Sequence, residues 1–190
     1  MVHKILVLAM FLLWQPWLAL RDRVAPARSP SPAQGVFVKG INFGGGAVVV
    51  GGNRWQSYAE ALDTGLSTPG AQTATTQKIP RPYASRGTRA MLNSVIFKAQ
   101  TLDIEQPLPN GSYDIYLWVM ENYQSHWHSL NLSVEGKPVA EGIGYLPQGA
   151  WRRYGPYPIV VDNGYLRLAL TTHSPNVDAH LMGLSIFKPD

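Results

Sequence analysis

The sequence contains no cysteine. Without cysteine the protein can form no disulfide, offers no thiol nucleophile and has no thiolate ligand for a metal, so its stability must come from the packing of its core. Charged residues are also few, at 15% of the 190 residues, whereas apolar residues make up 45%. This balance argues against a disordered chain or a coiled coil, and it suits one domain with a single sizeable core.

The chain also lacks an extended helical pattern, because its apolar residues nowhere repeat with helical spacing over twelve positions. From Val36 onward, short β-type segments are separated by glycine, proline and asparagine, with no internal repeat. In residues 128–134 apolar and polar side chains alternate, as in a strand with one wet face, and residues 165–171 show the same pattern. The sequence therefore predicts an all-β fold, an antiparallel β-sandwich of the jelly-roll type.

The start of the chain has the layout of a secretion signal. Lys4 precedes an unbroken apolar run from Ile5 to Trp14. A membrane anchor is the alternative, but a span needs about 20 apolar residues, and Pro16 and Arg21 cut this run short. Residues 1–27 are therefore interpreted as a signal peptide.

Two cleavage sites fit this signal. The A-x-A pattern at residues 25–27 lies far from the apolar run, and residues 18–20 lie close to it but match less well. Removal of residues 1–27 reduces 16 basic and 12 acidic residues to 13 and 11, so the net charge falls from +4 to +2. That loss removes the main support for nucleic-acid binding. We expect a secreted, cell-surface or periplasmic protein without membrane contact after cleavage, with a linker at residues 28–35 and one domain at residues 36–190.

Three features predict how the strands are arranged. Residues 113–121 are apolar on both faces, so this strand is expected to be central. Pro158 predicts that the strand at residues 157–162 lies at the edge of a sheet. Residues 63–82 are rich in threonine, glycine, glutamine and proline, and are interpreted as a long surface loop.

Two further strands are expected near the middle and the end of the domain. One covers residues 94–104, and the other covers residues 179–187. The second strand changes its apolar register across Gly183, which indicates a β-bulge.

The connections are expected to alternate between the two ends of the sandwich. Tight turns then share one end, at residues 110–111, 135–137 and 163–164. Longer loops share the other end, at residues 79–91, 122–127, 145–155 and 172–178. These loops are rich in tryptophan and tyrosine, whose exposure costs hydration free energy unless they bind something.

A sugar would use both kinds of side chain that these loops supply. A pyranose ring packs its apolar C–H face on an aromatic ring, and its hydroxyl groups exchange hydrogen bonds with arginine, asparagine or carboxylate groups. The loops include basic residues such as Arg152 and Arg153. We predict eight ligand-binding residues at this end: Tyr83, Arg89, Glu121, Tyr123, Trp127, Trp151, Asn176 and Asp178.

Packing is the alternative role for the aromatic residues. Trp127 is the preferred platform for a sugar, although it could pack on the loop below it. Trp151 could instead plug the top of the core. Trp55 is expected to cover an open edge of the sandwich, and Trp118 to pack inside the fold.

No catalytic residue, metal site or cofactor is predicted. His126 and His128 lie on one face of a strand and could share a metal ion, but no third ligand with suitable spacing lies nearby. A polysaccharide hydrolase would need two carboxylates in one groove. Glu121 and Asp178 are the only candidates at the loop end, and no motif links them.

Three segments stand out in order along the domain: residues 41–45, residues 110–113 with the strand that leads to residues 121–123, and residues 179–186. Together they resemble malectin-like and related galactose-binding-like carbohydrate-binding modules. The resemblance implies a β-sandwich that binds sugar through loops at one end. It assigns a stacking role to Tyr123, and a polar role to the loop before the last strand, residues 173–178.

The chain departs from this pattern at several positions. Gln124 stands where malectin has a second aromatic residue, and His173 lies nearest the position of its carboxylate. Asn176 is more similar to the sugar-binding asparagine of some bacterial modules. The acidic N-terminal motif that binds structural calcium in several such modules is missing, so a calcium ion has no support from the sequence.

The leading hypothesis is therefore a secreted, non-catalytic domain that binds a carbohydrate or polysaccharide at the loop end. The first alternative is a cell-surface structural or protein-interaction domain, whose loop aromatics contact a partner protein. The second is a polysaccharide-active hydrolase or lyase with Glu121 and Asp178 facing one groove.

Overall fold

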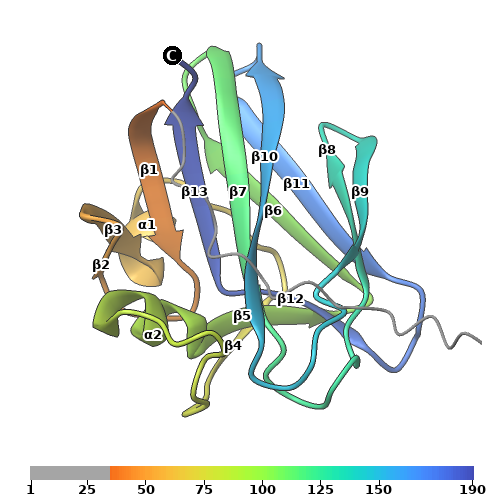
Figure 1. The fold of residues 1–190 in the computed structure, drawn as a ribbon. Coiled ribbons are helices and arrows are strands. Elements are labelled where there is room, and N and C mark those ends of the chain that lie inside the picture. Colours follow the sequence, from red (N-terminus) through yellow and green to blue (C-terminus); the bar gives the residue numbers. More distant parts are fainter. Residues whose placement is uncertain (1–34) are drawn as a thin grey trace, which may run out of the picture.

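The computed structural model describes residues 35–190, so the predicted signal peptide and all but the last residue of the predicted linker lie outside the described residues. The described chain forms thirteen strands and two short helices (Figure 1). In chain order they are β1 (Val36–Asn42), β2 (Val48–Val50), β3 (Asn53–Ser57), α1 (Tyr58–Asp63), β4 (Gln72–Thr75), α2 (Arg86–Leu92), β5 (Ser94–Ala99), β6 (Thr101–Pro107), β7 (Gly111–Met120), β8 (Leu130–Val134), β9 (Lys137–Ile143), β10 (Trp151–Val161), β11 (Tyr165–Thr172), β12 (Asp178–Leu181) and β13 (Gly183–Lys188).

The strands form two packed sheets and a third, smaller one. The six-stranded sheet has the order β10-β7-β13-β1-β3-β2, and the four-stranded sheet has the order β6-β11-β8-β9. The small sheet has the order β12-β5-β4 and lies toward the bottom of Figure 1, near α2. All but one of the strand pairs are antiparallel, the exception being β1 with β3. The predicted all-β sandwich is confirmed.

The central position of β7 explains why its sequence is apolar on both faces. Ile115, Leu117 and Val119 belong to the main core, which lies between the two large sheets. Trp118 and Met120 point to the opposite face, as the alternation along a strand requires, and belong to a second cluster. That cluster includes Trp55 and residues of α2, so part of the outer face of the six-stranded sheet is also covered.

Two predicted strands are each divided between sheets, and this corrects the sequence interpretation. Residues 94–104 turn at Gln100, whose φ of 62° ends β5, and β6 then enters the four-stranded sheet. Residues 179–187 do not form one bulged strand, because β12 belongs to the small sheet and β13 to the six-stranded sheet. The predicted loop at residues 63–82 also contains a strand, β4, which pairs with β5.

Tight turns and longer connections lie at opposite ends of the sandwich, but two predicted loops are partly wrong, since α2 begins at Arg86 and β10 begins at Trp151. At the hairpin end, Asn110 Nδ2 donates to the carbonyl of Asp162 over 2.9 Å, and Gly164 N donates to Asn110 Oδ1 over 2.8 Å. At the loop end, the backbone N–H of Arg81 donates to Gly149 O, and that of His126 donates to Leu146 O. Strand β10, which contains Pro158, lies at the edge of its sheet, as predicted. No helix within residues 35–190 has the length and apolar character of a membrane span.

Candidate functional site

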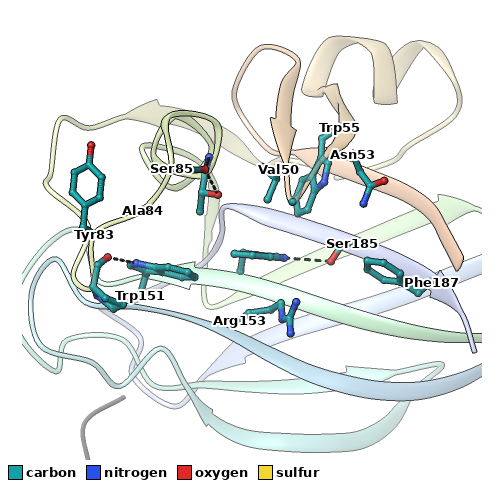
Figure 2. Close-up of a pocket in the computed structure, with 14 residues that line it drawn as sticks. Val50, Asn53, Trp55, Tyr83, Ala84, Ser85, Trp151, Arg153, Ser185 and Phe187 are labelled. Carbon is teal, nitrogen blue, oxygen red and sulfur yellow. Dashed lines mark hydrogen bonds between the residues drawn. The ribbon is translucent and has the colours of Figure 1, made fainter. Parts of the chain in front are cut away.

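A pocket of about 490 Å³ lies on the outer face of the six-stranded sheet (Figure 2). Strand β10 contributes Trp151 and Arg153, and β13 contributes Ser185 and Phe187. Opposite them stand residues 50–55 of the β2–β3 hairpin, and the segment at residues 82–85 that leads into α2. Distant parts of the chain thus enclose one concave site, the usual form of a small-molecule pocket.

Three tryptophans shape this pocket. The indole rings of Trp118 and Trp151 are nearly parallel, at 13°, with centroids 5.5 Å apart. The ring of Trp55 meets Trp118 edge-on, with centroids 5.8 Å apart. Trp151 Nε1 donates to Pro82 O over 2.7 Å, and Trp118 Nε1 donates to Ser185 Oγ over 3.3 Å. These contacts hold the aromatic surface rigid, and a rigid surface loses little entropy when a ligand binds.

Arg153 is the charged group of the pocket. Its guanidinium carbon lies 4.6 Å from the ring centroid of Tyr116 and 5.7 Å from that of Trp118. Burial lowers the pKa of Arg153, yet an arginine remains cationic at neutral pH. Within residues 35–190, Arg153 takes part in no ion pair, so its N–H groups can donate to a ligand oxygen.

Two of the eight predicted site residues lie at this pocket. Tyr83 stands at the rim and is 78% exposed, and Trp151 lies below it (Figure 2). Arg89 lies on α2 with an exposed side chain but does not line the pocket. Trp55 packs against Trp118 and over Gly40 and Gly183, so it covers the outer face of the six-stranded sheet and not the predicted open edge.

Tyr123 and Trp127 form a separate aromatic pair at the loop end. Their rings meet edge-on with centroids 5.2 Å apart, and they are 55% and 37% exposed. Asn176 and Asp178 line another hollow, of about 390 Å³, with Gln72 and residues 97–99. The structure therefore distributes the predicted residues over more than one place on the surface.

Glu121 is fully buried. Its carboxylate accepts hydrogen bonds of 3.0 Å from the backbone N–H groups of Tyr123 and His128, and it contacts the ring of His128. Burial would raise the pKa of Glu121, but the hydrogen bonds from His128 and Tyr123 outweigh it and lower this pKa. Glu121 thus holds the loop around residues 122–128 in place and does not reach the surface.

His128 lies at the centre of a polar cluster beside Glu121. Its Nδ1 is 3.0 Å from Glu121, and its Nε2 is 3.7 Å from Asp178 Oδ1. Burial lowers the pKa of His128, but the two carboxylates outweigh this effect and raise it. The ring of His180 meets that of His128 edge-on, with centroids 3.9 Å apart, and burial lowers the pKa of His180 to about 3.

The sequence predicts His126 and His128 on one face of a strand, but the structure shows that they do not lie together. His126 turns away and packs against Tyr145, with ring centroids 4.7 Å apart. The partners of His128 come instead from β12, about fifty residues further along the chain. The groove with two facing acids that the hydrolase alternative requires is not formed by Glu121 and Asp178, since Glu121 is buried and both carboxylates lie beside His128.

Several pocket residues carried no signal in the sequence. Asn53 and Ser85 lie in turns and caps, where asparagine and serine are common for local reasons. Ser185 and Phe187 occupy the outward positions of β13, and only the sheet order reveals what covers them.

No protein-family model and no curated protein matches this sequence. Solved structures match it in fold. A β-glucuronidase of Bacteroides uniformis superposes with a TM-score of 0.65 at 15% identity, over 80% of this chain and 18% of the enzyme. The ANX2 ectodomain from Arabidopsis thaliana superposes with a TM-score of 0.63 at 18% identity, over 81% of this chain and 50% of the ectodomain. A structure of the plant peptide RALF23 in complex with FER and LLG2 gives a TM-score of 0.60 at 13% identity, over 85% of this chain and 42% of that one.

The chain spans at most half the length of these structures. ANX2 and FER are plant receptor-like kinases. At these identities the similarity shows the architecture alone, and it agrees with the predicted antiparallel β-sandwich.

Proposed function

We propose that this protein is an exported, non-catalytic domain that binds a carbohydrate in the pocket between β10, β13 and the β2–β3 hairpin. The observation that carries the proposal is the nearly parallel pair Trp118 and Trp151, which lines a pocket of about 490 Å³ beside the cation of Arg153. This volume lies within the range of small-molecule sites, about 300–1,000 Å³.

The chemistry of the pocket matches both halves of a sugar. The apolar C–H face of a pyranose would pack on the indole surface, with Tyr83 closing the rim. Its hydroxyl groups would accept hydrogen bonds from Arg153, and would exchange them with the side chains of Asn53 and Ser85. A single site of this kind binds weakly, with a Kd on the order of micromolar to millimolar.

A glycan array followed by calorimetry would test the proposal. Tyr83→Ala is the first variant, because its exposed side chain can be removed without opening the core, and Trp151→Ala is the second. Trp127→Ala is the matched comparison, since Trp127 was the preferred platform on sequence grounds and lies outside the pocket. We expect loss of sugar binding in the first two variants and retention in the third.

Other results would redirect the proposal. Loss of binding in Trp127→Ala alone would move the sugar to the loop end, beside Tyr123, Asn176 and Asp178, where the sequence predicted it. The absence of binding to any glycan would overturn the proposal.

The exposed aromatics of the loop end favour a second candidate function, contact with a partner protein. Tyr123, Trp127 and Tyr145 are exposed outside the pocket, and exposed aromatic residues are enriched in protein interfaces. A similar fold occurs in a structure that contains the peptide RALF23 with FER and LLG2. Cross-linking at a photoreactive residue placed at Tyr145 would test this candidate, and indifference to sugars would favour it.

A further inference from the structure

Side chains from three sheets converge at the loop end. Glu121 directly follows β7 of the six-stranded sheet, and His128 precedes β8 of the four-stranded sheet. Asp178 and His180 belong to β12 of the small sheet. Since these two residues are separated by one position in a strand, their side chains point to the same face.

The distances within this group suit a single ion. His128, Asp178 and His180 each offer one ligand atom, and these three atoms lie within 4.8 Å of one another. His128 Nε2 and Asp178 Oδ1 are already 3.7 Å apart. Ligands about 2 Å from a tetrahedral zinc ion are roughly 3.3 Å apart, so small side-chain movements would bring the three atoms around one ion.

An independent observation indicates that the ring of His180 is available to coordinate an ion. His180 is 1% exposed, and within residues 35–190 neither of its ring nitrogens has a hydrogen-bond partner. Buried polar side chains without a partner are rare and call for an explanation. Coordination of an ion would use the lone pair of one nitrogen.

Glu121 and Asp178 add two features that metal centres share. The carboxylate of Glu121 contacts Nδ1 of His128, which leaves Nε2 toward Asp178, and a carboxylate that orients a ligating histidine in this way is common. Asp178 is 38% exposed, so solvent reaches the group and can supply a further ligand.

We propose that His128, Asp178 and His180 bind one divalent transition-metal ion, for which zinc is the best match to two imidazoles and one carboxylate. Water completes the coordination, and Glu121 orients His128. The ion joins the small sheet to the segment that leads into the four-stranded sheet, and Glu121 links His128 to the end of β7 in the six-stranded sheet. A chain without cysteine cannot make such a cross-link by a disulfide.

The test uses the purified protein without a histidine tag, stripped with a chelator. Calorimetry with zinc chloride and elemental analysis after dialysis should give one zinc ion per chain. Zinc should also raise the melting temperature, because a ligand that binds only the folded state stabilises it. Loading with Co²⁺ should give the strong visible absorption of a four-coordinate ion.

Three variants distinguish zinc binding at this group from zinc binding by other histidines of the chain. Asp178→Asn removes one ligand at a half-exposed position and should weaken zinc binding at least tenfold. His126→Gln and His173→Gln alter exposed histidines outside the group and should bind zinc as the wild type does. The melting curve of each variant in the presence of chelator reports whether that variant folds. The Co²⁺ spectrum of the wild type tests the site even if a variant fails to fold.

The proposal is overturned if the wild type retains no zinc after dialysis, or if Asp178→Asn binds zinc as tightly as the two control variants. A Co²⁺ spectrum of a six-coordinate, hydrated ion would also overturn it. These readouts involve no sugar, so they are independent of the carbohydrate proposal.

Discussion

Glu121 and His128 form a buried pair in which Nδ1 of the ring lies 3.0 Å from both carboxylate oxygens. The backbone N–H of His128 donates to the same carboxylate, also over 3.0 Å. One acidic side chain therefore fixes both the ring and the backbone of His128, and with them the orientation of a loop that the sequence assigned to ligand binding.

Glu121→Gln should destabilise the protein by roughly 2–4 kcal/mol. Glutamine keeps the shape of the side chain but removes the charge, and its amide group would face N–H donors that then lose an acceptor. Urea denaturation in the presence of a chelator measures this loss without any contribution from metal. Glu141→Gln, at an exposed position, should change the free energy of unfolding by less than about 0.5 kcal/mol. Equal stability of the two variants would show that the carboxylate is not needed.

In the metal-free protein, His180 should cost stability as the pH falls below about 6.5, whereas His128, whose pKa is raised, contributes in the opposite direction near that pH. The folded-state pKa of His180 is about 3, below its usual 6.5, because burial disfavours the charged ring. The unfolded chain therefore takes up a proton that the folded chain does not, and each pH unit below 6.5 costs up to about 1.4 kcal/mol. Urea denaturation at several pH values between 5 and 7 should give a smaller slope for His180→Gln than for the wild type. His173→Gln serves as the control, and an unchanged slope in His180→Gln would contradict this prediction.

Gly87→Ala should destabilise the contact between α2 and β2. A Cβ atom at position 87 would lie 1.9 Å from the backbone oxygen of Val49, so the helix must move away from the strand. Such overpacking typically costs about 1–3 kcal/mol. Gly46→Ala is the matched control, because a Cβ there meets nothing within 4 Å. A melting temperature for Gly87→Ala equal to that of the control would indicate that the helix is loosely held.

Arg153→Lys should weaken sugar binding roughly three- to tenfold while leaving the fold intact. Lysine keeps the charge but loses the planar group that packs over Tyr116 and Trp118 and that presents several N–H donors. Arg152→Lys is the control, because Arg152 is the neighbouring residue and does not line the pocket. Calorimetry with the best glycan from the array compares the two variants, and equal affinities would remove Arg153 from the site.

The strands were predictable where the pattern of apolar and polar residues along the chain reflects the position of the strand in its sheet. The apolar residues on both faces of β7 indicate that both faces are covered. Pro158 indicates that β10 has a neighbouring strand on only one side. A change of sheet leaves at most an ambiguous trace. The register shift across Gly183 fits a β-bulge as well as a transfer between sheets, and residues 94–104 show no break in their apolar pattern that marks a turn. The turn at Gln100 and the transfer at Met182 therefore became visible only in three dimensions.

The site was predictable only in part, for a related reason. Trp151 and Tyr83 stood out because the sequence placed both in loops, where large aromatic residues are unusual. Tyr83 does lie in a loop, whereas Trp151 is the first residue of β10. Asn53 and Ser185 lie near opposite ends of the domain sequence, and nothing local in the sequence indicates that they meet. The metal-binding group combines His128 with β12 in the same way, across about fifty residues.

Trp118 belongs at once to the second core cluster and to the wall of the pocket. Any change of this indole alters folding and recognition together, whereas Tyr83 at the rim can vary at almost no cost to folding. The base of the pocket is thus tied to folding, whereas Tyr83 at its margin is not. A related chain could acquire a new sugar preference through the margin alone, and selection or design for a different ligand should begin at residues 53, 83 and 85.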